Sequence, residues 1–93
     1  MKKNSLRPDL GNCPVCEQGL VHIARCPLCD DWSAVCDDCE AIWSKPSLVF
    51  RSRPDSQHPE CPHCQGMVPR WNFGTRKQLH DAGFGHLLEG HTD

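Results

Sequence analysis

The sequence predicts a small, metal-stabilised α+β fold, built from short β-hairpins with two four-cysteine sites and a short C-terminal helix. Three observations predict it. The chain has only 93 residues, of which 18 are Leu, Ile, Val or Phe, so its apolar core is small for a fold stable by itself. Eight cysteines stand in four C-x-x-C pairs. A Thr-x-x-Gln capping box at residues 75–78 marks the start of a helix.

The four cysteine pairs are typical of metal-binding knuckles. Two intervening residues fold the backbone into a tight turn that brings both sulfurs to one tetrahedral ion. The N-terminus has two lysines but no apolar segment of a secretory signal, so we expect a cytoplasmic protein without disulfides. No apolar run is long enough to cross a membrane. We therefore expect two Zn²⁺ ions per chain, bound by Cys13/Cys16, Cys26/Cys29, Cys36/Cys39 and Cys61/Cys64.

Iron is the alternative metal. Rubredoxin-like and zinc-ribbon knuckles usually carry Gly directly after the second cysteine, whereas this chain has Glu17, Asp30, Glu40 and Gln65 there. No C-x-x-C-x-x-C run predicts an iron–sulfur cluster. Zinc is therefore the expected ion.

Three segments follow from the composition along the chain. Residues 1–12 are expected to form a flexible lead, residues 13–74 the two-zinc knuckle and ribbon domain, and residues 75–93 a helix and tail. Within the domain, residues 20–25 and 32–35 predict two antiparallel strands with the second cysteine pair at the hairpin tip. Residues 41–43 and 48–51 predict another strand pair that turns at Pro46. Residues 52–60 contain two prolines and predict a mobile loop.

The C-terminal helix is expected to begin at Arg76, with Gly83 as the C′ residue just beyond its end. Leu79 and Phe84 would then make the hydrophobic contact of a Schellman motif. One more helical turn is expected through Leu87 and Leu88.

The spacing of the pairs favours alternate pairing. Joining the first and third pairs gives C-x2-C-x19-C-x2-C, a spacing typical of zinc ribbons, and leaves room for the hairpin between the ligands. Sequential pairing, in which neighbouring pairs share an ion, remains open. The expected sites are site 1, with Cys13, Cys16, Cys36 and Cys39, and site 2, with Cys26, Cys29, Cys61 and Cys64.

Two family resemblances accompany these motifs. The gap pattern is similar to cross-braced two-zinc modules such as RING, FYVE and plant-homeodomain fingers, and Cys61-Pro62-His63-Cys64 resembles the C-P-x-C that ends a RING domain. RING and plant-homeodomain fingers have a histidine ligand near the third pair, and residues 30–35 contain none. Cys13-Pro14-Val15-Cys16 together with residues 35–43 resembles small bacterial-type zinc-ribbon proteins. That resemblance implies a fold and a metal but no activity.

No catalytic residue is expected, because eight thiolates would close both tetrahedra and leave no open coordination position. His58-Pro59-Glu60 matches only half of a zinc-deaminase signature, and His86, Glu89 and His91 do not match a metalloprotease motif. The histidines are expected to face solvent or to lie beside the ligands: His22, His58, His63, His80, His86 and His91.

Charge and aromatic residues indicate the partner class. Residues 1–40, 41–79 and 80–93 carry net charges of −3, +4 and −3, and two zinc ions on eight thiolates would bring the protein to about −6. Trp32 and Trp43 are expected to pack over the knuckles. Trp71 is the best candidate of the three for an exposed contact, although core packing is slightly favoured for it too. We therefore expect a non-catalytic protein-interaction or adaptor module with a protein partner. The alternatives are a nucleic-acid-associated regulator that binds weakly through the basic middle segment, with Trp71 and Phe73 for stacking, and a thiol redox or metal sensor.

Overall fold

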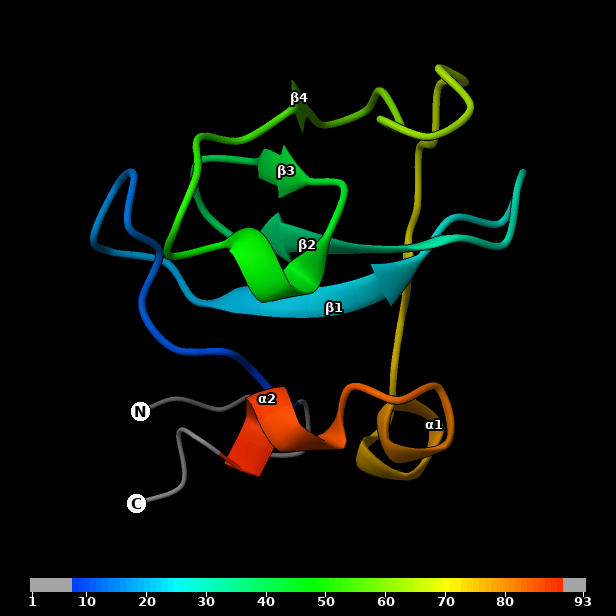
Figure 1. The fold of residues 1–93 in the computed structure, drawn as a ribbon. Coiled ribbons are helices and arrows are strands. Elements are labelled where there is room, and N and C mark those ends of the chain that lie inside the picture. Colours follow the sequence, from blue (N-terminus) through cyan, green and yellow to red (C-terminus); the bar gives the residue numbers. More distant parts are fainter. Residues whose placement is uncertain (1–7, 90–93) are drawn as a thin grey trace.

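The computed structural model describes residues 8–89, which form a small antiparallel sheet with short helices (Figure 1). The strand order is β4-β3-β2-β1-β5, and every neighbouring pair is antiparallel. The elements are β1 (Val21–Arg25), β2 (Trp32–Cys36), β3 (Ala41–Trp43), the 3₁₀ helix η1 (Pro46–Leu48), β4 (Ser56–Gln57), β5 (Asn72–Phe73), α1 (Arg76–Asp81) and α2 (Gly85–Glu89).

The hairpin predicted for the first two strands is confirmed. The β1–β2 ladder runs from Val21 opposite Cys36 to Arg25 opposite Trp32. Residues 26–31 form its tip, so the second cysteine pair lies at the end of the hairpin, as expected. Figure 1 shows this tip, in cyan, and the first knuckle, in blue, at opposite ends of β1.

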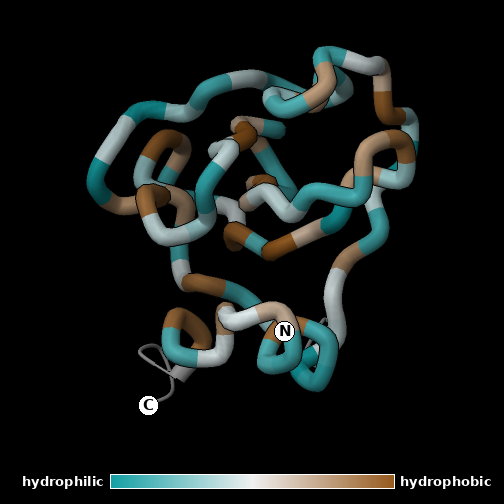
Figure 2. The backbone as a smooth tube through the Cα atoms, turned by 45° about the vertical axis from the view of Figure 1, so that its right-hand side comes forward, coloured by the Kyte–Doolittle hydropathy of each residue, from teal (hydrophilic) through white to brown (hydrophobic). Residues whose placement is uncertain are grey.

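Alternate residues of the three central strands face two separate apolar clusters, as the period of two of a β-strand requires. One face packs against side chains of both helices, and the other packs against Val68 and Trp71 of the segment that returns from the last cysteine pair. The first cluster takes Val21, Ile23, Ala34, Ala41 and Trp43 from the strands, and the second takes Ala24, Val35 and Ile42. Figure 2 shows hydrophobic segments in the middle of the fold and also in the chain around it, where they alternate with hydrophilic segments.

The C-terminal helix begins and ends as the sequence predicts. The Thr75 side chain accepts from the Gln78 N–H at 3.2 Å, and the Gln78 side chain accepts from the Thr75 N–H at 3.0 Å, which completes the capping box. At the other end, the Phe84 N–H donates to the Leu79 carbonyl at 2.8 Å and Gly83 has a φ of 93°, as in a Schellman motif. Leu79 and Leu88 are both buried in the first cluster, which fixes the two helices against the sheet.

Two segments differ from the sequence prediction. The strand expected at residues 48–51 is wrong, because Pro46 begins a 3₁₀ helix and the following N–H groups of Arg51 and Ser52 both donate to the Leu48 carbonyl. Proline favours a helical first turn, since its φ is already suitable and its missing N–H has no partner there. The loop expected at residues 52–60 contains β4, which pairs with β3 at the edge of the sheet.

The chain before the first knuckle also makes contacts that the sequence did not indicate. Leu10 is buried, and its N–H donates to the Val21 carbonyl at 2.8 Å. The Val21 N–H in turn donates to the Gly11 carbonyl at 3.1 Å. Residues 1–7 of the expected lead lie outside the described residues. None of the helices found in residues 8–89 has the length and apolar character to cross a membrane.

Candidate metal centres

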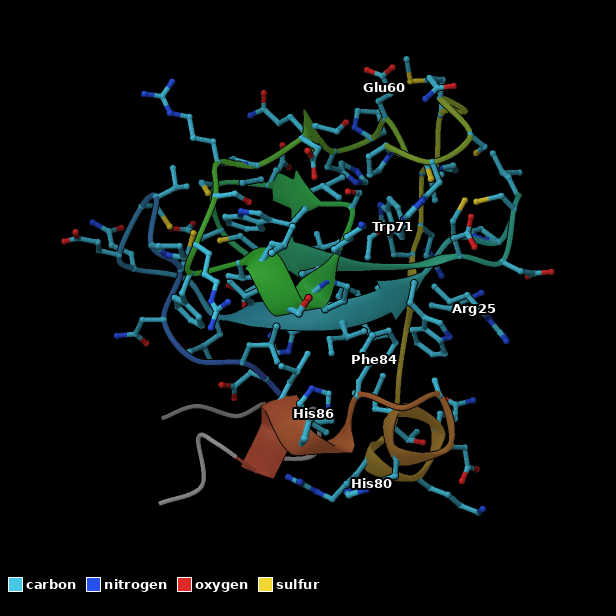
Figure 3. All side chains as sticks on the ribbon, in the orientation of Figure 1. Arg25, Glu60, Trp71, His80, Phe84 and His86 are labelled. Carbon is cyan, nitrogen blue, oxygen red and sulfur yellow. The ribbon has the colours of Figure 1, made fainter. Side chains whose placement is uncertain are left out.

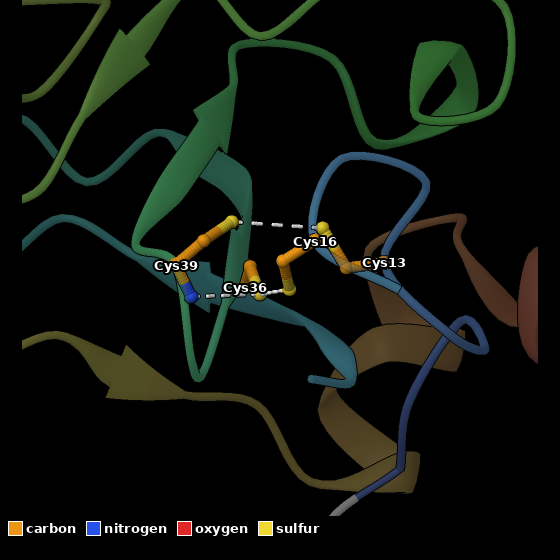
Figure 4. Close-up of side chains that lie close together, drawn as sticks. All are labelled: Cys13, Cys16, Cys36 and Cys39. Atoms are coloured by element: carbon orange, nitrogen blue, oxygen red, sulfur yellow. Dashed lines mark hydrogen bonds between the residues drawn. The ribbon is translucent and has the colours of Figure 1, made fainter. Parts of the chain in front are cut away.

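The structure brings together alternate cysteine pairs. In each group of four, the sulfur atoms all lie within 4.8 Å of one another, and all eight cysteines are free thiols. Site 1 consists of Cys13, Cys16, Cys36 and Cys39 (Figure 4), and site 2 consists of Cys26, Cys29, Cys61 and Cys64. The sequential grouping is not the one adopted.

The sulfur–sulfur distances fit a tetrahedral metal ion. They are 3.7 Å for Cys13–Cys39 and for Cys16–Cys36 in site 1, and 3.9 Å for Cys26–Cys64 and 3.8 Å for Cys29–Cys61 in site 2. Metal–sulfur bonds of about 2.3 Å at tetrahedral angles place the sulfurs about 3.8 Å apart. A disulfide would need about 2.05 Å. Both tetrads are therefore positioned to bind metal ions.

The β1–β2 hairpin holds one site at each end. Cys13 and Cys16 precede β1, and Cys36 is the last residue of β2, so site 1 closes the open end of the ladder. Site 2 joins the hairpin tip to the fourth knuckle, which follows β4 in the chain. The ladder between the two sites has five residue pairs, the first of which contains Cys36 of site 1. At about 3.3 Å per residue, this spacing makes them two separate centres and not one cluster.

All four knuckles share one backbone geometry. The residue two after the first cysteine donates its N–H to that cysteine's sulfur at 3.3–3.4 Å in each knuckle. The residue directly after the second cysteine has a positive φ in each knuckle, a conformation that usually favours glycine. These residues are Glu17 (59°), Asp30 (66°), Glu40 (68°) and Gln65 (60°). The absence of glycine from these positions therefore does not prevent the turn.

The cysteine thiols have different pKa values because their surroundings differ. The backbone N–H groups of Gln18 and Gly19 lower the pKa of Cys16 to about 7, and the Gly19 N–H lies 3.4 Å from the sulfur. Burial raises the pKa of Cys29 and of Cys36 to about 12. Near neutral pH, Cys16 is therefore the cysteine that is most readily deprotonated. Metal binding must release protons from the Cys29 and Cys36 thiols.

None of the described histidines belongs to either tetrad. Of the two alternatives expected for the histidines, His22 takes the place beside the ligands: only 1% of it is exposed, and its ring lies between the Pro8 carbonyl and the Asp37 carboxylate. His58 accepts a hydrogen bond from the Trp71 indole at 3.3 Å. His91 lies outside the described residues. Within residues 8–89, no third group of His, Cys, Asp or Glu is arranged to hold a metal ion.

The three tryptophans differ in burial and in their surroundings. Trp43 is fully buried in the cluster that contains Cys13 and Cys36, as expected. Trp71, the best sequence candidate for an exposed contact, is 5% exposed and packs in the second cluster. Trp32 is half-buried and lines a hollow that the sequence did not predict. That hollow depends on the approach of Phe84, far along the chain, so no local pattern could have indicated it.

The chain matches no protein-family model, no curated protein and no solved structure.

Proposed function

We propose that each tetrad binds one Zn²⁺ ion. Four thiolates at tetrahedral spacing are a donor set that suits zinc, which has no redox chemistry and no geometric preference from d electrons. Backbone N–H groups that donate to the sulfurs disperse their negative charge in all four knuckles. Four sulfurs fill a tetrahedral coordination sphere, so neither ion would bind a substrate or an activated water. We therefore propose a structural role for both ions and no catalysis.

The proposed ions would supply stability that the apolar core lacks. Structural zinc sites in small modules contribute on the order of 10 kcal/mol each to folding. Chelation with excess EDTA should therefore abolish the near-ultraviolet circular dichroism of the tryptophans, and added Zn²⁺ should restore it. A chain that keeps this signal without metal would contradict the structural role.

We propose further that the metal-held fold serves as a protein-interaction module. One observation carries this proposal, a hollow of about 340 Å³ beside site 2. Trp32 and Phe84 line it with ring centroids 6.2 Å apart, and Pro46 adds an apolar surface. A concave apolar surface with aromatic walls is typical of sites that take one apolar side chain of a partner.

The charges around this hollow favour an acidic partner segment. Lys45 lines the hollow, and in residues 8–89 its amine has no ion pair. The Arg25 guanidinium lies 5.6 Å from the Trp32 ring centroid, and its Nε is buried without a hydrogen-bond partner in the described part of the chain. Figure 3 shows Arg25 and Phe84 near the same end of β1. Asp31, on the same hollow, lies 3.7 Å from His63. We therefore propose a peptide segment with one apolar or aromatic side chain flanked by carboxylates.

Nucleic acid is the second candidate, because aromatic rings beside free cations can also bind a single strand. Negative charge opposes nucleic-acid binding. It comes from the carboxylates of Glu17, Asp30 and Glu40 and from the two tetrathiolate sites. Oligouridine binding should be no tighter than about micromolar at physiological salt.

A peptide selection tests the proposed partner chemistry. Random twelve-residue peptides displayed on phage would be selected on the zinc-loaded full chain. The enriched peptides should combine Asp or Glu with an aromatic or large aliphatic residue. Their binding should be lost in Lys45→Glu and kept in Arg53→Glu, which reverses an exposed charge that does not line the hollow. Enrichment of basic peptides, no enrichment, or equal binding to both variants would contradict the proposal. Oligouridine binding tighter than micromolar that only Lys45→Glu abolishes would favour the nucleic-acid role.

A further inference from the structure

In each metal centre, one side chain inside a knuckle forms a hydrogen bond with backbone that lies just beyond the other knuckle of the same site. In site 1 this residue is Asp37, between Cys36 and Cys39. Its Oδ1 accepts from the Leu20 N–H at 3.0 Å, and its own N–H donates to the Leu20 carbonyl at 3.0 Å. Leu20 lies just beyond the Cys13/Cys16 knuckle. These two bonds join the first and third knuckles without involving a sulfur.

His22 holds the Asp37 carboxylate in place from the other side. Its Nε2 lies 3.2 Å from Asp37 Oδ2, and its Nδ1 lies 3.0 Å from the Pro8 carbonyl. Carbonyl and carboxylate oxygens only accept, so the ring is the donor in both contacts and makes both bonds in its doubly protonated form. The ring is 1% exposed and stacks edge to face with Phe73, so its orientation is fixed by packing. A buried polar ring with both nitrogens engaged restricts the carboxylate beyond what a surface contact would.

Site 2 has a corresponding residue in His63, which lies between Cys61 and Cys64. Its Nε2 is 2.9 Å from the Ser44 carbonyl and 3.3 Å from the Trp32 carbonyl. Both partners are carbonyl oxygens, so Nε2 carries the hydrogen and donates. Trp32 lies just beyond the Cys26/Cys29 knuckle, and Ser44 follows β3. The fourth knuckle is thereby joined to the hairpin tip, again without a sulfur.

We propose that Asp37 and His63 are positioning residues that control how fast metal leaves site 1 and site 2, respectively. This inference rests on the metal binding proposed above. A metal ion with four thiolates can leave only when two knuckles separate, and each of these side chains resists that separation at its own site. Loss of a group that hydrogen-bonds to a metal ligand typically costs 10–100-fold in metal affinity, and we use the same scale for these bonds between the knuckles. We expect an increase of about that size in the release rate, confined to the site of the altered residue.

Cadmium loading of the full-length chain gives a separate ¹¹³Cd resonance for each four-thiolate site. Release to excess chelator would be followed on both resonances. Asp37→Ala should accelerate release from site 1 about 10–100-fold and leave site 2 within about twofold. His63→Leu should do the reverse. Asp37→Asn keeps an acceptor for the Leu20 N–H and should restore most of the retention at site 1, which a charge effect alone would not do.

Asp38→Ala is the matched control, since it removes the same charge from the same knuckle and Asp38 makes no side-chain hydrogen bond in residues 8–89. It should leave release from both sites unchanged. Equal effects of Asp37→Ala and Asp38→Ala would overturn the inference. Equal acceleration of release at both sites, in Asp37→Ala or in His63→Leu, would also overturn it. If Asp37→Ala fails to fold, Asp37→Leu and Asp37→Asn are compared by the same two resonances, and equal release rates would overturn it. A wild-type chain that takes up no cadmium would instead overturn the proposed metal binding.

Discussion

The backbone N–H of His58 donates to the carbonyl of Glu40 at 2.9 Å. Glu40 directly follows the last cysteine of site 1, and His58 lies three residues before Cys61 of site 2. This bond belongs to the edge of the sheet where β4 pairs with β3, and it links the two metal centres on the side away from the hairpin ladder. The two centres are therefore joined through two routes, the β1–β2 ladder and the β3–β4 edge.

Because of this double connection, we expect the two zinc ions to bind cooperatively. Filling either site orders the sheet that the other site needs, and coupling between sites in proteins is typically about 1–3 kcal/mol. Native mass spectrometry during a zinc titration should show the one-zinc species below its statistical population. A one-zinc species at or above the statistical level would contradict this coupling.

Replacing Glu17 by glycine should stabilise the folded protein by about 0.5–1 kcal/mol, because Glu17 has a φ of 59° that costs an L-residue energy and glycine none. Gln18→Gly is the matched control in the same knuckle. It should destabilise by about 0.5–1 kcal/mol, since Gln18 lacks a positive φ and glycine only adds unfolded-state entropy. Urea unfolding of the zinc-loaded variants measures both. Equal changes in the two variants would rule out a strained left-handed turn.

Gly19→Ala should disturb site 1 more than Gly66→Ala disturbs site 2. A Cβ at Gly19 would lie 2.6 Å from the Asp38 Cβ, 2.7 Å from Asp37 Oδ1 and 2.8 Å from the Cys36 sulfur. We expect a loss of about 1–3 kcal/mol in unfolding free energy. A Cβ at Gly66 would meet the exposed end of Leu28, which can move, and would lie 3.4 Å from the Cys64 sulfur, so the loss should be under about 1 kcal/mol. Thermal unfolding of the two variants at equal zinc concentration makes the comparison. Equal losses would show that the crowding at site 1 is relieved by backbone movement.

Zinc affinity should rise with pH. Zinc binds thiolates, and burial raises the pKa of Cys29 and Cys36 to about 12, so both thiols still carry protons near neutral pH before the ion binds. Each uptake of zinc must release these protons, and acidification must reverse it. The stability that zinc supplies is therefore present at and above neutral pH and is lost as the pH falls. Calorimetry in buffers of different ionisation enthalpy should report proton release, and its absence would contradict these protonation states.

Local sequence signals predicted the elements that depend on local chemistry. The knuckle spacing, the hairpin between the first and third pairs and the helix from Arg76 all follow from residues close together in the chain. Thr75 and Gln78 define the helix start because their side chains satisfy N–H groups within the same turn. For the cysteine grouping, the spacing favoured alternate pairs but left sequential pairing open, and the structure brings the alternate pairs together.

Contacts between distant segments could not be predicted in this way. One local signal was also misinterpreted: the apolar run at residues 48–51 predicted a strand, yet Pro46 begins the 3₁₀ helix Pro46–Leu48 and Phe50 is 53% exposed. His22 lies in a strand like any half-buried residue, and only the positions of Pro8 and Asp37 explain its burial. Tertiary partners therefore determined the burial of His22.

The most direct test of two metal sites built from alternate pairs is the zinc count by native mass spectrometry. We predict two zinc ions on the wild-type chain and one on the variant in which serine replaces Cys26, Cys29, Cys61 and Cys64. We predict none on the variant in which serine replaces Cys13, Cys16, Cys26 and Cys29, because that change halves both sites. One zinc on the second variant and none on the first would show sequential pairing and contradict the account.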